Sequence, residues 1–168
     1  MSWEHHLEHW IVGQRLGWLN PFFIALSWIG SLGAIWLAIA VVLTLLWRRP
    51  SILVTVLAAD VAADLLAEAG KAIVHRHRPF ETQLGPRSSA YSFPSGHTAT
   101  SFACATVLAA FVPRLRIPFF VLATLIALSR IYNGMHYPTD VLAGAVLGVL
   151  TALLLLAATR RRLRPARR

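Results

Sequence analysis

Long apolar segments restrict this chain to a helical membrane protein more strongly than any other feature of the sequence. No residue between Pro21 and Trp47 is charged. A helix needs about 20 residues to cross the roughly 30 Å hydrocarbon core of a bilayer. Further apolar stretches run from Ser51 to about Val74, from Pro94 to Val112, from near Pro118 to Asn133, and from Pro138 to Thr159. We therefore expect an all-α integral membrane protein, a bundle of about five transmembrane helices.

The composition agrees with this class and argues against a soluble protein. Hydrophobic residues make up 57% of the 168 residues and charged residues only 14%, whereas soluble domains carry roughly 25% charged residues. The net charge of +9 alone would suggest a nucleic-acid partner. However, most cations lie in three short clusters beside apolar stretches, as at cytoplasmic helix ends. We expect the lipid bilayer, and no nucleic acid, as partner. The single cysteine, Cys104, excludes an internal disulfide and a Cys-based zinc site.

The first 19 residues differ from the rest of the chain. One helical face is apolar: Trp3, Leu7, Trp10, Ile11 and Trp18. The other face is polar: Glu4, His5, Glu8 and His9. This pattern predicts an amphipathic helix in the membrane interface, with its polar face in water. We expect one membrane domain over residues 1–168, made of an interfacial helix (1–19), a transmembrane bundle (20–159) and a basic cytoplasmic tail (160–168).

The charge distribution predicts the orientation in the membrane. With five spans, the arginines at 48–49, 114–116 and 160–168 share one side, which the positive-inside rule places in the cytoplasm. Fifteen Arg residues against one Lys, with many Ala residues, are typical of a GC-rich bacterial genome. We therefore expect a bacterial inner-membrane protein with a cytoplasmic C-terminus. The outer side then receives the loop around residues 71–94 and the turn around residues 130–138.

Three clusters of polar residues fall on this outer side. Lys71 and Arg78 are cations on the side where positive charge is disfavoured, which indicates a local anion such as phosphate. The segment Pro94-Ser95-Gly96-His97 opens a helix, whose N-terminus favours an anion. His97 can transfer a proton near neutral pH.

The third cluster contains Arg130, His136 and Asp140. Asp140 can accept a hydrogen bond from one ring nitrogen of His136, which leaves the other nitrogen as a nucleophile. Each cluster alone has an ordinary explanation as a helix cap, a loop histidine or a lipid contact. Together they supply cations, anion-binding backbone, a nucleophile and a second histidine for a leaving group.

The three clusters resemble the tripartite signature of the type 2 phosphatidic acid phosphatase superfamily, which also includes bacterial acid phosphatases and vanadium haloperoxidases. That signature reads Lys-x6-Arg-Pro, Pro-Ser-Gly-His and Ser-Arg-x5-His-x3-Asp, and every position matches between Lys71 and Asp140. The resemblance implies that His136 attacks phosphorus to form a phosphohistidine, that Asp140 orients it, and that His97 protonates the leaving oxygen and then activates water. It also implies a phosphate cradle without metal or cofactor, formed by Lys71, Arg78, Ser95, Gly96 and Arg130.

An acidic stripe lies outside this signature. Asp60, Asp64 and Glu68 recur every fourth residue and share a helical face with Lys71. We expect Glu68 to orient Lys71 and count Asp64 as a second supporting residue. Hydrogen bonding between helices and a proton or substrate role both remain open for the stripe. A membrane transporter that uses these three carboxylates is the alternative from a different functional class.

The resemblance also indicates a lipid phosphate as substrate. The first expectation is a polyprenyl diphosphate such as undecaprenyl diphosphate, because small bacterial members of this type often recycle that carrier. A phosphatidylglycerophosphate or phosphatidic acid phosphatase and a polyprenyl-phosphoryl sugar phosphatase remain open. The apolar composition disfavours a haloperoxidase.

Overall fold

The computed structural model describes residues 3–79, 83–85 and 90–162. The end of the expected basic tail and part of the loop before Pro94 therefore lie outside the described residues. The helical elements, in chain order, are α1 (Trp3–Gly13), η1 (Gly17–Leu19), α2 (Asn20–Ile29), η2 (Ser31–Gly33), α3 (Ala34–Trp47), α4 (Pro50–Val74), α5 (Gly96–Phe111), η3 (Pro113–Leu115), α6 (Arg116–Tyr132) and α7 (Pro138–Arg162). The all-α expectation is confirmed for these residues.

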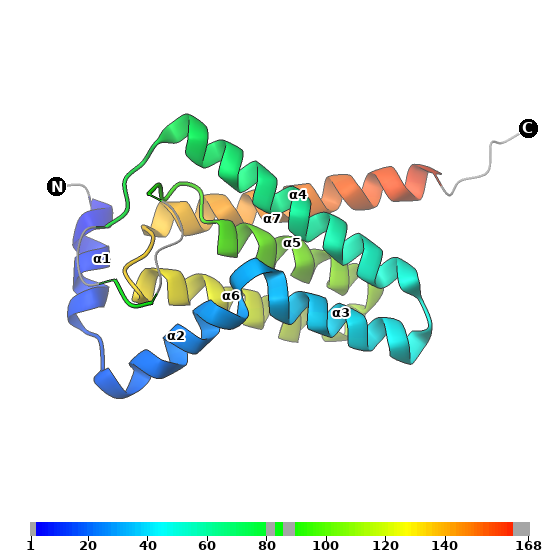
Figure 1. Ribbon diagram of the computed structural model, residues 1–168, viewed down its shortest axis with the longest axis horizontal. Helices are drawn as coiled ribbons and strands as arrows, with labels where there is room; N and C mark the ends of the chain where they lie inside the picture. Colours follow the sequence, from blue (N-terminus) through cyan, green and yellow to red (C-terminus); the bar gives the residue numbers. More distant parts are fainter. Residues whose placement is uncertain (1–2, 80–82, 86–89, 163–168) are drawn as a thin grey trace, which may run out of the picture.

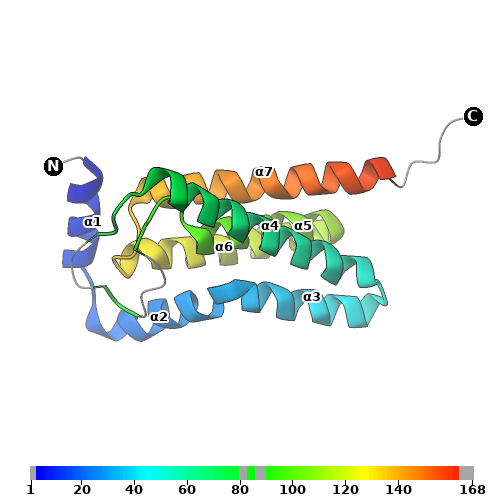
Figure 2. The same cartoon turned by 45° about the horizontal axis from the view of Figure 1, so that its top comes forward.

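Helix α5 lies at the centre of the bundle and packs against α4, α6 and α7 (Figures 1 and 2). Small residues allow this close packing. A Cβ atom at Gly144 of α7 would lie 2.6 Å from the Ser95 carbonyl oxygen, and one at Gly148 would lie 2.1 Å from that of Ala99. Glycines one turn apart therefore let α7 approach the start of α5, as small residues do between membrane helices.

The two ends of the bundle differ. Figure 1 shows α1 lying across one end, beside the α4–α5 and α6–α7 connections. The opposite end carries the α3–α4 turn and the C-terminus of α7. Because α4 ends, α5 begins, α6 ends and α7 begins at the α1 end, all three signature segments meet there.

Two described segments are long and apolar enough to cross a membrane, Pro113–Tyr132 and Pro138–Thr159. The expected first span is not one straight helix, because α2 and α3 meet at an angle of 61° and form a third span only if taken together. Gly33, at the break, has a φ of 63°. Helix α4 carries four charged residues, and α5 has 16 residues, fewer than the about 20 that a bilayer requires. The five-span count therefore stays a prediction.

Helix α1 covers Trp3–Gly13, a shorter span than the expected 1–19, and its polar face lies only partly in solvent, since His5 and His9 are exposed. Trp3 and Trp10 are 61% and 63% exposed, whereas Glu8 is only 4% exposed. Glu4 accepts a hydrogen bond from Arg76. The prediction of a solvated polar face is wrong for these two glutamates, because α1 packs on the bundle end, against α6 and α7, where polar partners are available. Its location in the membrane interface stays a prediction.

Candidate active site

His136 lies in the α6–α7 connection and is 1% exposed. Its Nδ1 atom donates a hydrogen bond to the Ser92 carbonyl oxygen at 2.8 Å. Its Nε2 atom lies 3.1 Å from Nη1 of Arg78, which also donates to the Met135 carbonyl at 2.9 Å. The proton of the neutral ring therefore sits on Nδ1, and the unprotonated Nε2 accepts a hydrogen bond from the Arg78 guanidinium, which can only donate.

Burial is the first cause that places the pKa of His136 well below its usual value. The charges of Arg130, Arg78 and Lys71 lower this pKa further, and the hydrogen bond to Ser92 opposes them. The imidazole is therefore neutral at neutral pH. A neutral ring whose Nε2 atom is unprotonated can act as a nucleophile once a phosphate takes over the contact with Arg78.

Asp140, expected to orient His136, is fully buried in the first turn of α7. Its Oδ2 atom lies 3.6 Å from Nδ1 of His136 and accepts a hydrogen bond from the Tyr137 backbone N–H at 2.9 Å. The direct acceptor for the His136 ring is thus the Ser92 carbonyl. Asp140 lies further from the ring, and its hydrogen bond from the Tyr137 N–H holds the turn that carries His136.

Arg76 connects Asp140 to helix α1. It donates to Oδ1 of Asp140 and to the Thr139 hydroxyl, both at 2.8 Å, and to Glu4 at 3.1 Å. Its guanidinium also lies 4.1 Å from the centre of the Tyr137 ring. The signature does not include Arg76 or Ser92, and the sequence did not predict the contacts that either residue makes with His136 and Asp140. The only available signal was the position of Arg76 inside the basic cluster before Arg78.

His97 lies in the first turn of α5 and is half-buried. Its Nε2 atom is 3.1 Å from the Ser31 hydroxyl of η2. On the neighbouring α2, the Ser27 hydroxyl accepts a hydrogen bond from Nη1 of Arg130, a residue 3% exposed. The broken first segment thus contacts two of the expected site residues, a pair of contacts that the sequence did not predict.

The remaining cradle residues lie at the junction of α4 and α5. Lys71 is 6% exposed, and its Nζ atom lies 2.5 Å from Oε1 of Glu68. A Cβ atom at Gly96 would lie 3.6 Å from this Nζ and 3.7 Å from a carboxylate oxygen of Asp64. The Ser95 N–H donates to the Asp140 carbonyl at 3.0 Å, which joins α5 to α7.

A cavity of about 380 Å³ opens beside His97. Its lining includes Lys71, Gly96 and the carboxylates of Asp60, Asp64 and Glu68. The acidic stripe of α4 therefore adjoins the site. Asp60 itself is 7% exposed, and its carboxylate accepts a hydrogen bond from the Cys104 thiol at 3.7 Å.

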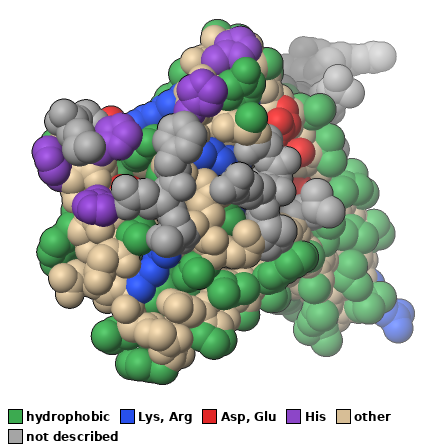
Figure 3. All heavy atoms as spheres, turned by 60° about the vertical axis from the view of Figure 1, so that its left-hand side comes forward, with side chains coloured by type: hydrophobic (Ala, Val, Ile, Leu, Met, Phe, Trp, Pro, Cys, Tyr) green, Lys and Arg blue, Asp and Glu red, His purple; other side chains and the backbone are tan. Residues whose placement is uncertain are grey.

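Together these contacts bring two histidines and three cations to one end of the bundle. Lys71, Arg78 and Arg130 are close enough to act electrostatically on both His97 and His136. Figure 3 shows histidine and basic side chains gathered at this end, with hydrophobic side chains on the flank. Such an arrangement can bind a phosphate and provide a nucleophile and a proton donor.

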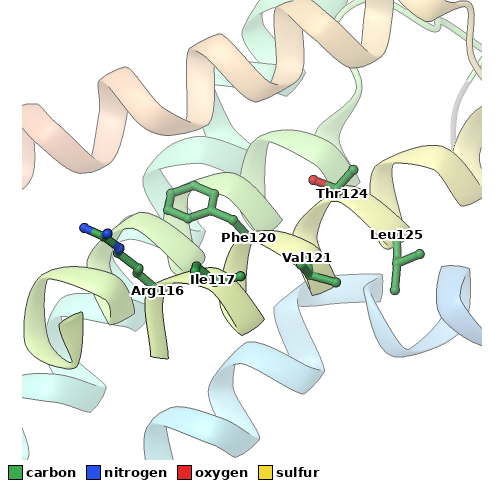
Figure 4. Close-up of a pocket in the computed structure, with 6 residues that line it drawn as sticks. All are labelled: Arg116, Ile117, Phe120, Val121, Thr124 and Leu125. Carbon is green, nitrogen blue, oxygen red and sulfur yellow. The ribbon is translucent and has the colours of Figure 1, made fainter. Parts of the chain in front are cut away.

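A second hollow, of about 460 Å³, lies on the outer face of α6 (Figure 4). Its lining is mostly apolar, with Arg116 near one end and Phe120 and Leu125 further along. None of its lining residues belongs to the expected site. Among the described residues, no group of three or more His, Cys, Asp or Glu side chains is arranged to hold a metal ion.

The comparisons with known proteins decide the family. The model described as "PAP2 superfamily" matches residues 49–164. The chain belongs to the PAP2 superfamily. The undecaprenyl-diphosphatase of Sulfolobus acidocaldarius is 31% identical over 140 residues, 80% of this chain and 68% of that protein. The bacitracin transport permease protein BcrC of Bacillus licheniformis is 31% identical over 153 residues, 84% of this chain and 72% of that protein.

The fold agrees with this membership. The crystal structure of the transmembrane PAP2 type phosphatidylglycerolphosphate phosphatase from Bacillus subtilis matches with a TM-score of 0.78 and 26% identity. The match covers 98% of this chain and 87% of that one. The chain is therefore an integral membrane PAP2 lipid phosphatase, a hydrolase. The transporter alternative is not better supported than the phosphatase assignment.

Proposed function

We propose that this PAP2 phosphatase hydrolyses a polyprenyl diphosphate, such as undecaprenyl diphosphate, through a phosphohistidine on His136. The observation that supports the mechanism is the tautomer of the His136 ring. Its Nδ1–H donates a hydrogen bond to the Ser92 carbonyl, and its unprotonated Nε2 lies against Arg78. The substrate class is supported by the likeness to the undecaprenyl-diphosphatase of Sulfolobus acidocaldarius over 80% of this chain.

The proposed reaction has two steps. First, Nε2 of His136 attacks the terminal phosphorus, the bond from phosphorus to the bridging oxygen breaks, and His97 gives its proton to that oxygen. Second, His97 takes a proton from a water molecule, which attacks the phosphohistidine and releases inorganic phosphate. Phosphoryl transfer depends mostly on positioning and charge stabilisation. The cradle that supplies both consists of Lys71, Arg78, Arg130, Ser95 and Gly96.

Asp140, Glu68 and Asp64 support this machinery in the proposal. Asp140, whose Oδ2 atom lies 3.6 Å from Nδ1 of His136, stabilises the positive charge that the His136 ring gains in the covalent step. Glu68 orients Lys71 through their 2.5 Å contact. Asp64 lines the cavity beside His97. The cations of the chain neutralise the phosphoryl oxygens, so we propose that no metal or cofactor takes part.

We further propose that the site faces the outer side of a bacterial inner membrane and that the C-terminus is cytoplasmic. The support is the distribution of charge. The arginines at 48–49 and 114–116 belong to the α3–α4 and α5–α6 connections, which lie at the bundle end opposite α1 and the site. In a Cys104→Ala background, His75→Cys should react with an impermeant maleimide in intact cells, and Arg49→Cys should not. Both positions are exposed. The reverse labelling pattern would contradict this orientation.

A phosphatidylglycerophosphate phosphatase is the second candidate, favoured by the structural match over 98% of this chain. The test is phosphate release by the purified enzyme from undecaprenyl diphosphate, phosphatidylglycerophosphate, phosphatidic acid and a polyprenyl-phosphoryl sugar phosphate. We expect the highest kcat/KM for undecaprenyl diphosphate. A higher value for phosphatidylglycerophosphate would transfer the assignment to the second candidate.

A further inference from the structure

The break in the first apolar segment places a serine hydroxyl on His97. Ser31 lies in η2, between Gly30 and Gly33. Gly33 has a φ of 63°, and a Cβ atom at Gly30 would lie 2.7 Å from the Ile126 side chain. The glycines therefore let the chain leave the helical path and approach α6. In this position η2 contacts α5, and Ser31 Oγ lies 3.1 Å from Nε2 of His97.

The direction of this hydrogen bond follows from proton counting. The Ser31 hydroxyl carries one proton, and its Oγ atom also lies 3.0 Å from the Ser27 carbonyl oxygen. A carbonyl oxygen only accepts hydrogen bonds, so the hydroxyl proton goes to Ser27. Ser31 can then only accept from His97. Nε2 of His97 therefore carries a proton, and Nδ1 is the ring nitrogen that gains and loses one.

We propose that Ser31 is a positioning residue that fixes His97 as the Nε2–H tautomer. This inference rests on the proposed role of His97 as proton donor to the leaving oxygen. Ser31 accepts a hydrogen bond from Nε2–H whether the ring is neutral or cationic. The ring therefore keeps its orientation while Nδ1 gains and loses a proton. His136 is held in the opposite tautomer, because its Nδ1 proton is donated to Ser92. The ring nitrogens left without a proton in the neutral rings are thus Nδ1 of His97 and Nε2 of His136.

The test compares two substrates that differ in their need for a proton donor. The alkyl leaving group of phosphatidic acid must be protonated, whereas para-nitrophenolate leaves without protonation. Ser31→Ala should lower kcat/KM for phosphatidic acid by about tenfold or more, a part of the roughly 10²–10⁴-fold that general acid catalysis contributes. It should change kcat/KM for para-nitrophenyl phosphate by less than about threefold. Ser31→Thr, which keeps the hydroxyl, should restore activity on phosphatidic acid.

Thr106→Ala is the matched control. Like Ser31, Thr106 donates a hydrogen bond to the carbonyl four residues earlier, that of Phe102 at 2.7 Å. Among the described residues, no hydrogen bond joins Thr106 to His97. It should leave the ratio of the two kcat/KM values unchanged.

Two results would overturn the inference. An equal loss on both substrates would assign Ser31 a purely structural role, and an unchanged ratio with full activity would show that the contact does not matter. The proposed function fails separately, if His97→Ala keeps full activity on phosphatidic acid while the Ser31 variants are also unaffected.

Discussion

The two histidines of the site are fixed by different parts of the chain. His136 is almost fully buried, and its ring N–H donates a hydrogen bond to a backbone carbonyl, that of Ser92. His97 is half-buried, borders a cavity, and contacts a side-chain hydroxyl from the broken first segment. No substitution of Ser92 removes its backbone carbonyl, whose position depends on the whole loop. A single substitution of Ser31, in contrast, removes the hydroxyl that contacts His97. We therefore call His136, the proposed nucleophile, the rigid half of the site. His97, the proposed proton donor, is the adjustable half, because a single substitution can remove its contact.

The largest effect is expected at the rigid half. His136→Ala should abolish turnover on lipid and aryl phosphates alike, because the covalent step has no other nucleophile in the proposed mechanism. Phosphate release by the purified variant, checked for folding by its thermal transition in detergent, measures this. If the variant turned over either substrate as fast as the native enzyme, His136 could not be the nucleophile.

The adjustable half should respond differently to the leaving group. His97→Ala should lower kcat/KM for phosphatidic acid by roughly 10²–10⁴-fold. The loss for para-nitrophenyl phosphate should be smaller, because its leaving group needs no proton. Equal losses on the two substrates would mean that His97 does not donate a proton to the leaving oxygen.

Arg76 tests whether helix α1 belongs to the rigid half. Arg76→Met removes the 2.8 Å contact to Asp140 and the contact to Glu4. Misplacing reacting groups by about 1 Å can cost on the order of 100-fold, and we expect kcat to fall by about 10- to 100-fold on both substrates. The matched control is Arg116→Met, in the α6 hollow (Figure 4), which should retain activity. Equal activities of the two variants would contradict a role for the Arg76 bridge.

The smallest effect is expected from metal removal. Since three basic side chains converge on both histidines, a chelator should leave kcat/KM unchanged on every active substrate. Vanadate should inhibit, because it adopts the trigonal-bipyramidal shape of the transferring phosphoryl group. Activity that is lost in chelator and restored by Mg²⁺ would contradict a cradle built from side chains alone.

The fold was predictable where local signals are strong. The end of α4 at Val74 and the start of α7 at Pro138 lie where the sequence predicts them, because proline and the end of an apolar run act locally. The break between α2 and α3 was not predictable. Isolated glycines are tolerated in helices, and the contacts that stabilise this bend, such as Gly30 with Ile126, come from a distant segment.

The site shows the same division. The signature residues reach one end of the bundle, as their predicted helix ends require. Arg76, Ser92 and Ser31 were missed because their contacts are made across the fold, and a carbonyl such as that of Ser92 carries no residue-type signal at all. The buried side of α1 was missed for a related reason, since a helix periodicity defines two faces but not which one packs on the bundle.

The most direct test of the account is a rapid acid-free quench with a substrate labelled in its terminal phosphate. We predict a base-stable, acid-labile phosphoenzyme with the label on His136, accumulating in the His97→Ala variant with para-nitrophenyl phosphate because hydrolysis of the intermediate is slowed. The His136→Ala variant should carry no label. Label on another residue, or turnover by His97→Ala with no phosphoenzyme at any time, would contradict the phosphohistidine mechanism.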